Sequence, residues 1–262
     1  MFDLKGKVAI ITGGNGGIGL GMARGLARAG ARVVVAGRNA DKSQRAVREL
    51  AGLGADAYAI ETDVTDEAAV ARLVAATLER CGRIDVLINN AAIFHDLDRR
   101  DQSLAYFNKI LSVNMTGVWL MSRAVERAMK QQKRGRIINQ SSTAAYMSNT
   151  GFIDASDPDV PSPPFHYSLA KLGVSGLTKF FAGALGPFGI NVNAICPGVT
   201  LTEATKTVVP APIMQAIVGN TALRRALQPE DLTGTAVFLA SSDSDMMTGQ
   251  VLVVDGGMIM LG

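Results

Sequence analysis

The residues of this 262-residue sequence that are best suited to do chemistry are Tyr167 and Lys171, which stand four positions apart. On a helix this spacing places both side chains on one face. A phenol with its reference pKa of about 10 exchanges protons poorly at neutral pH, and a neighbouring ammonium favours the phenolate. We therefore expect Lys171 to lower the pKa of Tyr167, and Tyr167 to act as a general acid and base. A surface Tyr/Lys pair without chemistry is the alternative.

A glycine-rich loop, Thr-Gly-Gly-Asn-Gly-Gly-Ile-Gly, begins at Thr12 directly after the apolar segment Val8 to Ile11 and precedes an amphipathic stretch. Gly13 permits a tight turn, and Gly17 and Gly19 let the backbone and the next helix approach closely. The amino terminus of that helix would present amide donors to a pyrophosphate. A turn that only connects a strand to a helix is the alternative.

The glycine loop and six further segments, in this order, resemble the short-chain dehydrogenase/reductase family over nearly the whole chain. The six segments are Asn89-Asn90-Ala91-Ala92, with alanine in place of the family's final glycine, Asn114 within Val-Asn-Met-Thr-Gly, Ser141-Ser142, Tyr167-Ser-Leu-Ala-Lys171, Pro197-Gly198 with Thr202, and Asp255-Gly256-Gly257. The resemblance implies an enzyme that transfers a hydride between a nicotinamide cofactor and a secondary alcohol or ketone.

The resemblance also assigns a role to each of four residues. Tyr167 is the general acid and base, Lys171 in addition hydrogen-bonds the nicotinamide ribose, and Asn114 anchors a water-linked proton relay. Ser142, rather than Ser141, aligns with the serine that holds the substrate oxygen. Because a carbonyl gains negative charge as hydride arrives, donors from Ser142 and Tyr167 would stabilise the transition state.

A larger set of residues is expected to bind the cofactor. They are Gly13, Asn15, Gly16, Gly17, Ile18, Gly19, Arg38, Asp63, Val64, Asn90, Ala91, Tyr167, Lys171, Pro197, Gly198, Thr200 and Thr202. The second strand ends at Gly37-Arg38-Asn39, without the acidic residue that binds the adenosine ribose of NAD in folds of this kind. Since the guanidinium of Arg38 suits a phosphate, NADP(H) is favoured. NAD(H) is the alternative, because the glycine loop carries Asn15 and Gly16 where many NADP-dependent members have a basic residue.

Seven short segments rich in Val and Ile are predicted as strands, and most are separated by stretches with helical spacing. They are Val8–Ile11, Val33–Ala36, Ala57–Ile60, Val86–Ile88, Ile137–Ile138, Val192–Ile195 and Val251–Val254. Continuous rather than alternating hydrophobicity indicates that both faces of the sheet are covered. The sequence therefore predicts an α/β fold, a Rossmann-like doubly wound parallel sheet of about seven strands with helices on both faces. We expect a single domain over residues 1–262.

Some residues are typical of helix ends. Thr65 is expected to cap a helix whose first turn holds Asp66 and Glu67. Gln228 precedes another helix with proline near its first position. The basic stretch 130–136 is predicted to end a helix, where cations complement the dipole.

Two regions depart from the family pattern. An insertion around 148–165 lengthens the stretch before Tyr167, so Ile153, Phe165 and His166 are candidates for substrate contact. A surface bulge unrelated to substrate is equally compatible. Residues 200–225 take the place of the family's mobile substrate lid. This segment is mostly apolar, which suggests a hydrophobic or weakly polar substrate or a segment packed on its own domain.

Composition excludes several classes of function. A formal net charge of +3 is too small and too scattered for nucleic-acid binding. Cys81 and Cys196 lie far apart and only two histidines are present, so neither a disulfide framework nor a metal site is predicted. The sequence begins without the features of a signal peptide and has no apolar stretch of ~20 residues. We expect a soluble, cytoplasmic protein that does not bind membranes.

Three other functions compete with a simple alcohol dehydrogenase or carbonyl reductase. A 3-oxoacyl-carrier-protein reductase is similar in length and motifs, but an acidic carrier needs a basic docking patch, and Lys179 to Gly189 contains no arginine. A sugar or polyol dehydrogenase is the second. A catalytically silent nucleotide-binding regulator is the third, and the presence of Ser142, Tyr167 and Lys171 argues against it.

The resemblance further implies a homo-oligomer, a tetramer or dimer, in which the Tyr167 helix and the long helix before it pack against a partner subunit. The apolar side chains that permit this packing would serve the core of a monomer equally well. They are Leu177, Phe180, Phe181 and Leu185.

Overall fold

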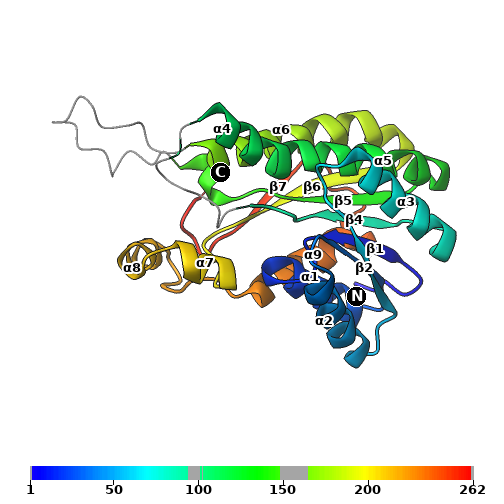
Figure 1. The fold of residues 1–262 in the computed structure, drawn as a ribbon, viewed down its shortest axis with the longest axis horizontal. Coiled ribbons are helices and arrows are strands. Elements are labelled where there is room, and N and C mark those ends of the chain that lie inside the picture. The colour runs from blue at the N-terminus through cyan, green and yellow to red at the C-terminus, as the bar shows by residue number, and fades with distance from the viewer. Residues whose placement is uncertain (1, 94–100, 102, 148–164, 261–262) are drawn as a thin grey trace.

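A seven-stranded parallel sheet runs through the middle of the computed structural model, which describes residues 2–93, 101, 103–147 and 165–260 (Figure 1). The strand order is β3-β2-β1-β4-β5-β6-β7. The strands are β1 Val8–Thr12, β2 Arg32–Gly37, β3 Ala57–Glu61, β4 Val86–Asn89, β5 Gly135–Gln140, β6 Ile190–Pro197 and β7 Val251–Val254. Each of the seven predicted strands is confirmed. Val and Ile are buried on both sides of the sheet because helices cover both faces.

Most of the helices form two layers, one on each face of the sheet, and the others lie beyond its end (Figure 1). They are α1 Gly17–Arg28, α2 Ala40–Gly52, α3 Glu67–Cys81, α4 Leu104–Leu111, α5 Gly117–Gln132, α6 His166–Leu185, α7 Glu203–Val208, α8 Ala211–Gly219 and α9 Thr233–Ala240. One core cluster joins the sheet to α1 and α9, and a second joins its other face to α3, α5 and α6. The predicted doubly wound, Rossmann-like fold is therefore confirmed.

The predicted cap of α3 is wrong by one residue. Asp66 is the N-cap, and its carboxylate accepts hydrogen bonds from the amides of Ala68 and Ala69. Thr65 instead donates its amide and its hydroxyl to the carboxylate of Asp63. A hydroxyl held in this way is not available to the helix.

The basic stretch 130–136 is only partly the end of a helix. Helix α5 ends at Gln132, and Lys133 follows in the left-handed conformation with a φ of 52°. Arg136 belongs to β5 and its side chain is only 5% exposed. An ion pair with Asp245 and a hydrogen bond donated to the Asn191 side chain offset the cost of burying its charge.

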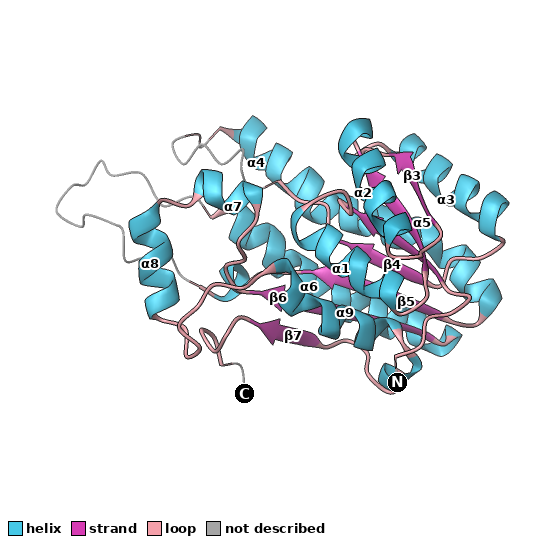
Figure 2. Ribbon diagram, turned by 90° about the horizontal axis from the view of Figure 1, so that it is seen from below, coloured by secondary structure: helices cyan, strands magenta, loops and turns pink. Residues whose placement is uncertain are grey.

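Helices α7 and α8 occupy the region of the predicted lid, at the end of the molecule where β6 finishes (Figures 1 and 2). The predicted insertion around 148–165 lies outside the described residues except for Phe165, and so does the substrate candidate Ile153. Within the described part of the chain, no helix is both long and apolar enough to cross a bilayer. The same residues contain no cluster of His, Cys, Asp and Glu that suits a metal ion.

Candidate active site

Several of the predicted site residues come from loops that follow neighbouring parallel strands. In the register of the sheet, Thr12 at the end of β1 lies beside Asn89 at the end of β4, and Asn89 lies beside Asn139 of β5. The glycine loop, Asn90 and Ser142 follow these three strands. In a doubly wound sheet, ligands bind in the crevice outside the carboxyl ends of the strands. The fold therefore collects segments from distant parts of the sequence at one edge.

Tyr167 and Ser142 meet at this edge through a side-chain hydrogen bond. Lys171 is one turn further along α6 and is 1% exposed. Its Nζ donates to the carbonyl oxygen of Gln140 at 2.9 Å and lies 5.6 Å from the centroid of the Tyr167 ring. Ser141 points elsewhere, because its Oγ donates to the backbone carbonyl of Lys171 and is completely buried. The side chains of Tyr167 and Lys171 thus lie on one face of α6, as their spacing of four residues predicts.

The expected effect of Lys171 on the pKa of Tyr167 is wrong for this structure. Burial raises the pKa of the Tyr167 phenol to about 12, against a smaller lowering by the hydrogen bond with Ser142. Burial also lowers the pKa of the Lys171 ammonium to about 8. Desolvation disfavours the charged form of both groups. The ammonium also donates a hydrogen bond to the Gln140 carbonyl.

Asn114 lies in a short π-helical turn, Ser112–Thr116, that joins α4 to α5. Its side chain is completely buried, and Nδ2 donates to the carbonyl oxygens of Ile93 and Ile110 at 3.2 and 3.0 Å. Its Oδ1 has no hydrogen-bond partner among the described residues. Buried acceptors are rarely left unpaired in folded proteins. A π turn that widens a helix at such a residue is frequent at functional sites.

Thr12 organises the glycine loop, although sequence reasoning gave it no role beyond its place in the motif. Its Oγ1 accepts hydrogen bonds from the amides of Asn90 and Ala91 at 3.0 and 3.1 Å. In return, Nδ2 of Asn90 donates to the carbonyls of Thr12 and Gly13. Asn90 therefore ties the end of β4 to the loop after β1. A Cβ at Gly19 would overlap the Gly13 carbonyl and the Asn90 amide, which explains the glycine there.

The start of α1 fits the pyrophosphate of a dinucleotide. No side chain among the described residues caps this helix, whose N-cap is Gly16. Side chains cap α2, α3 and α4. A Cβ at Gly16 would meet no atom within 4 Å, so the space in front of the helix is open. Free amide donors together with the helix dipole attract phosphate groups.

Arg38 follows β2, is 63% exposed and lies 4.0 Å from the carboxylate of Asp63. Burial alone would raise the pKa of Asp63, but hydrogen bonds from Thr65 and the charge of Arg38 bring it below its ordinary value. Asn15 in the glycine loop donates to Ser43 of α2 at 3.0 Å. The loop and the end of β2 thus form one surface that carries the exposed guanidinium.

The remaining cofactor candidates lie around the same edge. Val64 packs so closely on α5 that only a glycine fits at Gly117. Pro197 ends β6 and Gly198 donates its amide to β7. Thr200 is buried, and Thr202 caps α7 beside Gly17.

His166, a predicted substrate contact, begins α6 and is buried in an aromatic cluster. Its ring centroid lies 5.0 Å from that of Phe165, 5.3 Å from that of Phe107 and 5.8 Å from that of Tyr106. Neither ring nitrogen has a hydrogen-bond partner among the described residues. The imidazole therefore faces α4 within the described part of the chain.

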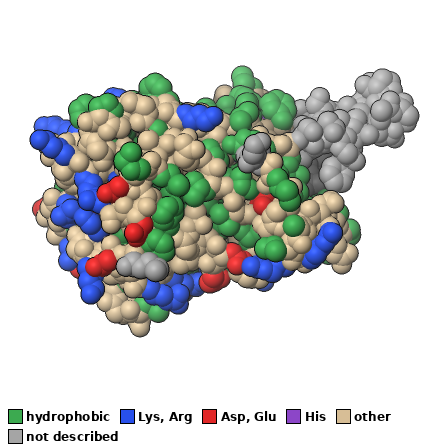
Figure 3. All heavy atoms as spheres, turned by 180° about the vertical axis from the view of Figure 1, so that it is seen from behind, with side chains coloured by type: hydrophobic (Ala, Val, Ile, Leu, Met, Phe, Trp, Pro, Cys, Tyr) green, Lys and Arg blue, Asp and Glu red, His purple; other side chains and the backbone are tan. Residues whose placement is uncertain are grey.

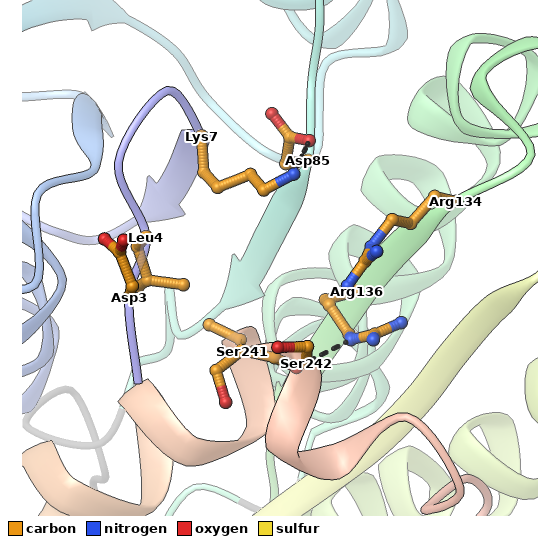
Figure 4. A pocket seen from close by; sticks show the side chains of 9 residues that line it. Asp3, Leu4, Lys7, Asp85, Arg134, Arg136, Ser241 and Ser242 are labelled. Carbon is orange, nitrogen blue, oxygen red and sulfur yellow. Dashed lines mark hydrogen bonds and ion pairs between the residues drawn. The ribbon is translucent and has the colours of Figure 1, made fainter. Parts of the chain in front are cut away.

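A cavity of about 220 Å³ lies at the opposite, amino-terminal edge of the sheet (Figure 4). Lys7 and Asp85 line it and form an ion pair at 3.5 Å. Arg134 and Arg136 also line it, and both pair with Asp245. None of the predicted site residues is among the described residues of its lining. This cavity is therefore separate from the candidate active site.

Comparison with known proteins places this geometry among oxidoreductases. A family model described as "Enoyl-(Acyl carrier protein) reductase" matches residues 13–259. An uncharacterised oxidoreductase of Mycobacterium tuberculosis is 41% identical over 264 residues, covering 99% of each chain. A 3-oxoacyl-[acyl-carrier-protein] reductase of Synechocystis is 38% identical over 262 residues, covering 99% of this chain and 100% of that protein.

Solved structures agree with these matches. A short-chain type dehydrogenase/reductase from Mycobacterium marinum has a TM-score of 0.87 at 37% identity, covering 98% of this chain and 97% of its own. A gluconate 5-dehydrogenase from Burkholderia cenocepacia, in complex with NADP and tartrate, has a TM-score of 0.87 at 34% identity, with 98% and 96% covered. A 7α-hydroxysteroid dehydrogenase, complexed with NADH and 7-oxo glycochenodeoxycholic acid, has a TM-score of 0.88 at 34% identity, with 98% and 95% covered.

Proposed function

The chain belongs to the short-chain dehydrogenase/reductase family, and from this we propose that it interconverts a secondary alcohol and a ketone with a nicotinamide cofactor, NADP(H) in preference to NAD(H). The observation that carries the proposal is the hydrogen bond between Tyr167 and Ser142, with Lys171 buried one turn away. The cofactor supplies or accepts the hydride when bound, and these residues handle the proton and the oxygen.

In the direction of reduction, Tyr167 donates its proton to the substrate oxygen while Ser142 donates a second hydrogen bond to the same atom. Both donors stabilise the negative charge that develops there. A phenol with a pKa of about 12 stays protonated at neutral pH, so it is ready to donate. Removal of a proton from an alcohol needs the phenolate, which this burial disfavours.

Lys171 and Asn114 extend the site away from the substrate oxygen. With its pKa near 8, the Lys171 ammonium can exchange a proton close to neutral pH and still holds most of its charge. The unpartnered Oδ1 of Asn114 is an acceptor for a water that would return protons to the site. We assign Asn114 to the positioning of that water.

The preference for NADP(H) is supported by the end of β2. The exposed Arg38 lies there, 4.0 Å from one carboxylate oxygen of Asp63, whose other oxygen accepts hydrogen bonds from Thr65. A guanidinium binds a phosphate with two parallel hydrogen bonds. One relative was solved with NADP and another with NADH, so measurement of both cofactors is essential.

Replacement of Tyr167 by Phe tests the catalytic assignment. The change removes the proton donor and keeps the ring, so we expect turnover of ketones to fall by at least ~10²–10⁴-fold while cofactor binding is preserved. Ser142→Ala should cost less, because Tyr167 still donates. Tyr58→Phe is the control, since Tyr58 lies on β3 and bonds Cys81. Full activity of the Tyr167 variant would refute the assignment.

Two narrower substrates are supported by particular relatives. The match to a 3-oxoacyl-[acyl-carrier-protein] reductase over the whole chain favours an acyl thioester. The likeness to a gluconate 5-dehydrogenase favours a sugar acid. Initial rates with acyl thioesters, sugar acids and simple ketones, each with both cofactors, separate the three possibilities.

A homo-oligomer completes the proposal. Of the four apolar residues singled out on α6, Phe181 and Leu185 belong to the core, whereas Phe180 is 65% exposed. Other exposed apolar residues on α5 and α6 are Trp119, Leu169 and Leu172. Figure 3 shows that hydrophobic side chains are also exposed on the face turned away in Figure 1. An exposed apolar helix face supports packing against a second copy.

A further inference from the structure

Helix α7 begins against the cofactor-binding half of the molecule through two contacts. The side chain of Thr202, its N-cap, lies so close to Gly17 that a Cβ added there would be 3.3 Å from Cγ2 of Thr202. The next residue, Glu203, accepts a hydrogen bond from Nζ of Lys42 at 3.2 Å. The two partners are separated by 161 residues in sequence. The start of the lid region is thus tied to both the glycine loop and α2.

The ammonium of Lys42 lies beside the start of α7, whose N-cap contacts the glycine loop. Lys42 lies in the first turn of α2, and its side chain reaches a residue adjacent to Thr202, which itself contacts Gly17. Arg38 is four positions earlier and is also exposed beside the loop. The exposed side of the predicted adenosine site therefore has two cations, of which only Arg38 was expected.

Each of these cations is paired with a carboxylate, and the two carboxylates are held very differently. Asp63 lies 4.0 Å from Arg38 and also accepts the amide and hydroxyl of Thr65, so it is fixed. Glu203 is 86% exposed, and its carboxylate pairs with the Lys42 ammonium. Exposed ion pairs contribute only about 0.2–1 kcal/mol, so this pair exchanges readily. Glu203 is therefore the carboxylate that can leave.

We propose that Lys42 is a second residue that selects NADP(H) over NAD(H), and that Glu203 competes with the 2′-phosphate of the cofactor for Lys42. The inference rests on the proposed preference for NADP(H). A phosphate carries nearly two negative charges at neutral pH and so attracts the ammonium more strongly than one carboxylate does. Binding of that phosphate frees Glu203 and removes one of the two ties of α7. The lid region is thereby linked to the type of cofactor bound.

Two fragments that differ only in the 2′-phosphate, 2′,5′-ADP and 5′-AMP, test this by calorimetric titration without any turnover. We expect Lys42→Met to weaken 2′,5′-ADP about fivefold, the equivalent of ~1 kcal/mol, and to leave 5′-AMP unchanged. Glu203→Gln should strengthen 2′,5′-ADP by about two- to fivefold. In the Lys42→Met background the Glu203 substitution should have no effect. Arg45→Met, an exposed cation on the same helix, is the matched control.

Four results would overturn the proposal, and each is distinct. Equal weakening of both fragments by Lys42→Met would indicate a structural role, and no weakening would remove Lys42 from the site. An effect of Glu203→Gln that persists without Lys42 would refute the competition. If the unmodified protein binds both fragments equally, the preference for NADP(H) itself is wrong. The Tyr167→Phe experiment is independent of all four.

Discussion

The buried ammonium of Lys171 should make the stability of the protein depend on pH in an unusual direction. Burial lowers its pKa from 10.5 to about 8. Below pH 8 both the folded and unfolded states carry the charge. Between pH 8 and 10.5 the folded state has lost the proton while the unfolded state keeps it, so stability rises with pH. A pKa shift of this size corresponds to roughly 3 kcal/mol of unfolding free energy. This energy is not reduced for solvent screening, because the Lys171 side chain is 1% exposed.

Lys171→Met removes this dependence. We expect the difference in unfolding free energy, unmodified protein minus variant, to rise by roughly 2–3 kcal/mol between pH 7 and pH 10. Urea denaturation of both proteins at pH 7, 8, 9 and 10 measures it. The rise in this difference does not depend on the hydrogen bond to Gln140, which shifts the absolute stability of the variant at every pH. Lys179→Met, exposed on the same helix, should give a flat difference. A flat or falling curve for Lys171→Met would refute the reasoning.

Two further predictions follow from packing. Gly19→Ala should cost about 1–3 kcal/mol of stability and most of the dinucleotide binding, since its Cβ would overlap Gly13 and Asn90. Gly16→Ala should keep the stability of the unmodified protein. Thermal unfolding of both variants separates the two cases, and equal losses of stability would contradict the packing argument. Phe180→Asp should shift the protein to a smaller species in sedimentation equilibrium, because the Phe180 side chain is 65% exposed and not part of the core. An unchanged mass would exclude this helix face from the contact between subunits.

Much of the fold could be predicted because the signals are local. A strand buried on both faces is continuously apolar, so Val8–Ile11 was recognisable from a few residues. The partly buried edge strand Val251–Val254 is apolar throughout as well, and it was recognisable in the same way. The order of the motifs and the spacing of Tyr167 and Lys171 were likewise visible in sequence. Boundaries were harder: Thr65 and Asp66 both suit a cap, and only the bonds between Thr65 and Asp63 decided between them.

The sequence by itself determined the family, the parallel sheet and the residue types at the carboxyl edge, since these depend on residue order and on short-range periodicity. The tertiary structure decided the electrostatics. Whether Lys171 lowers the pKa of Tyr167 depends on the water that surrounds both groups, and burial reverses the expected direction. Likewise, the contact of Lys42 with Glu203 joins residues that no local pattern connects. Desolvation and long-range pairing arise only when the chain has folded, which is why sequence alone did not show them.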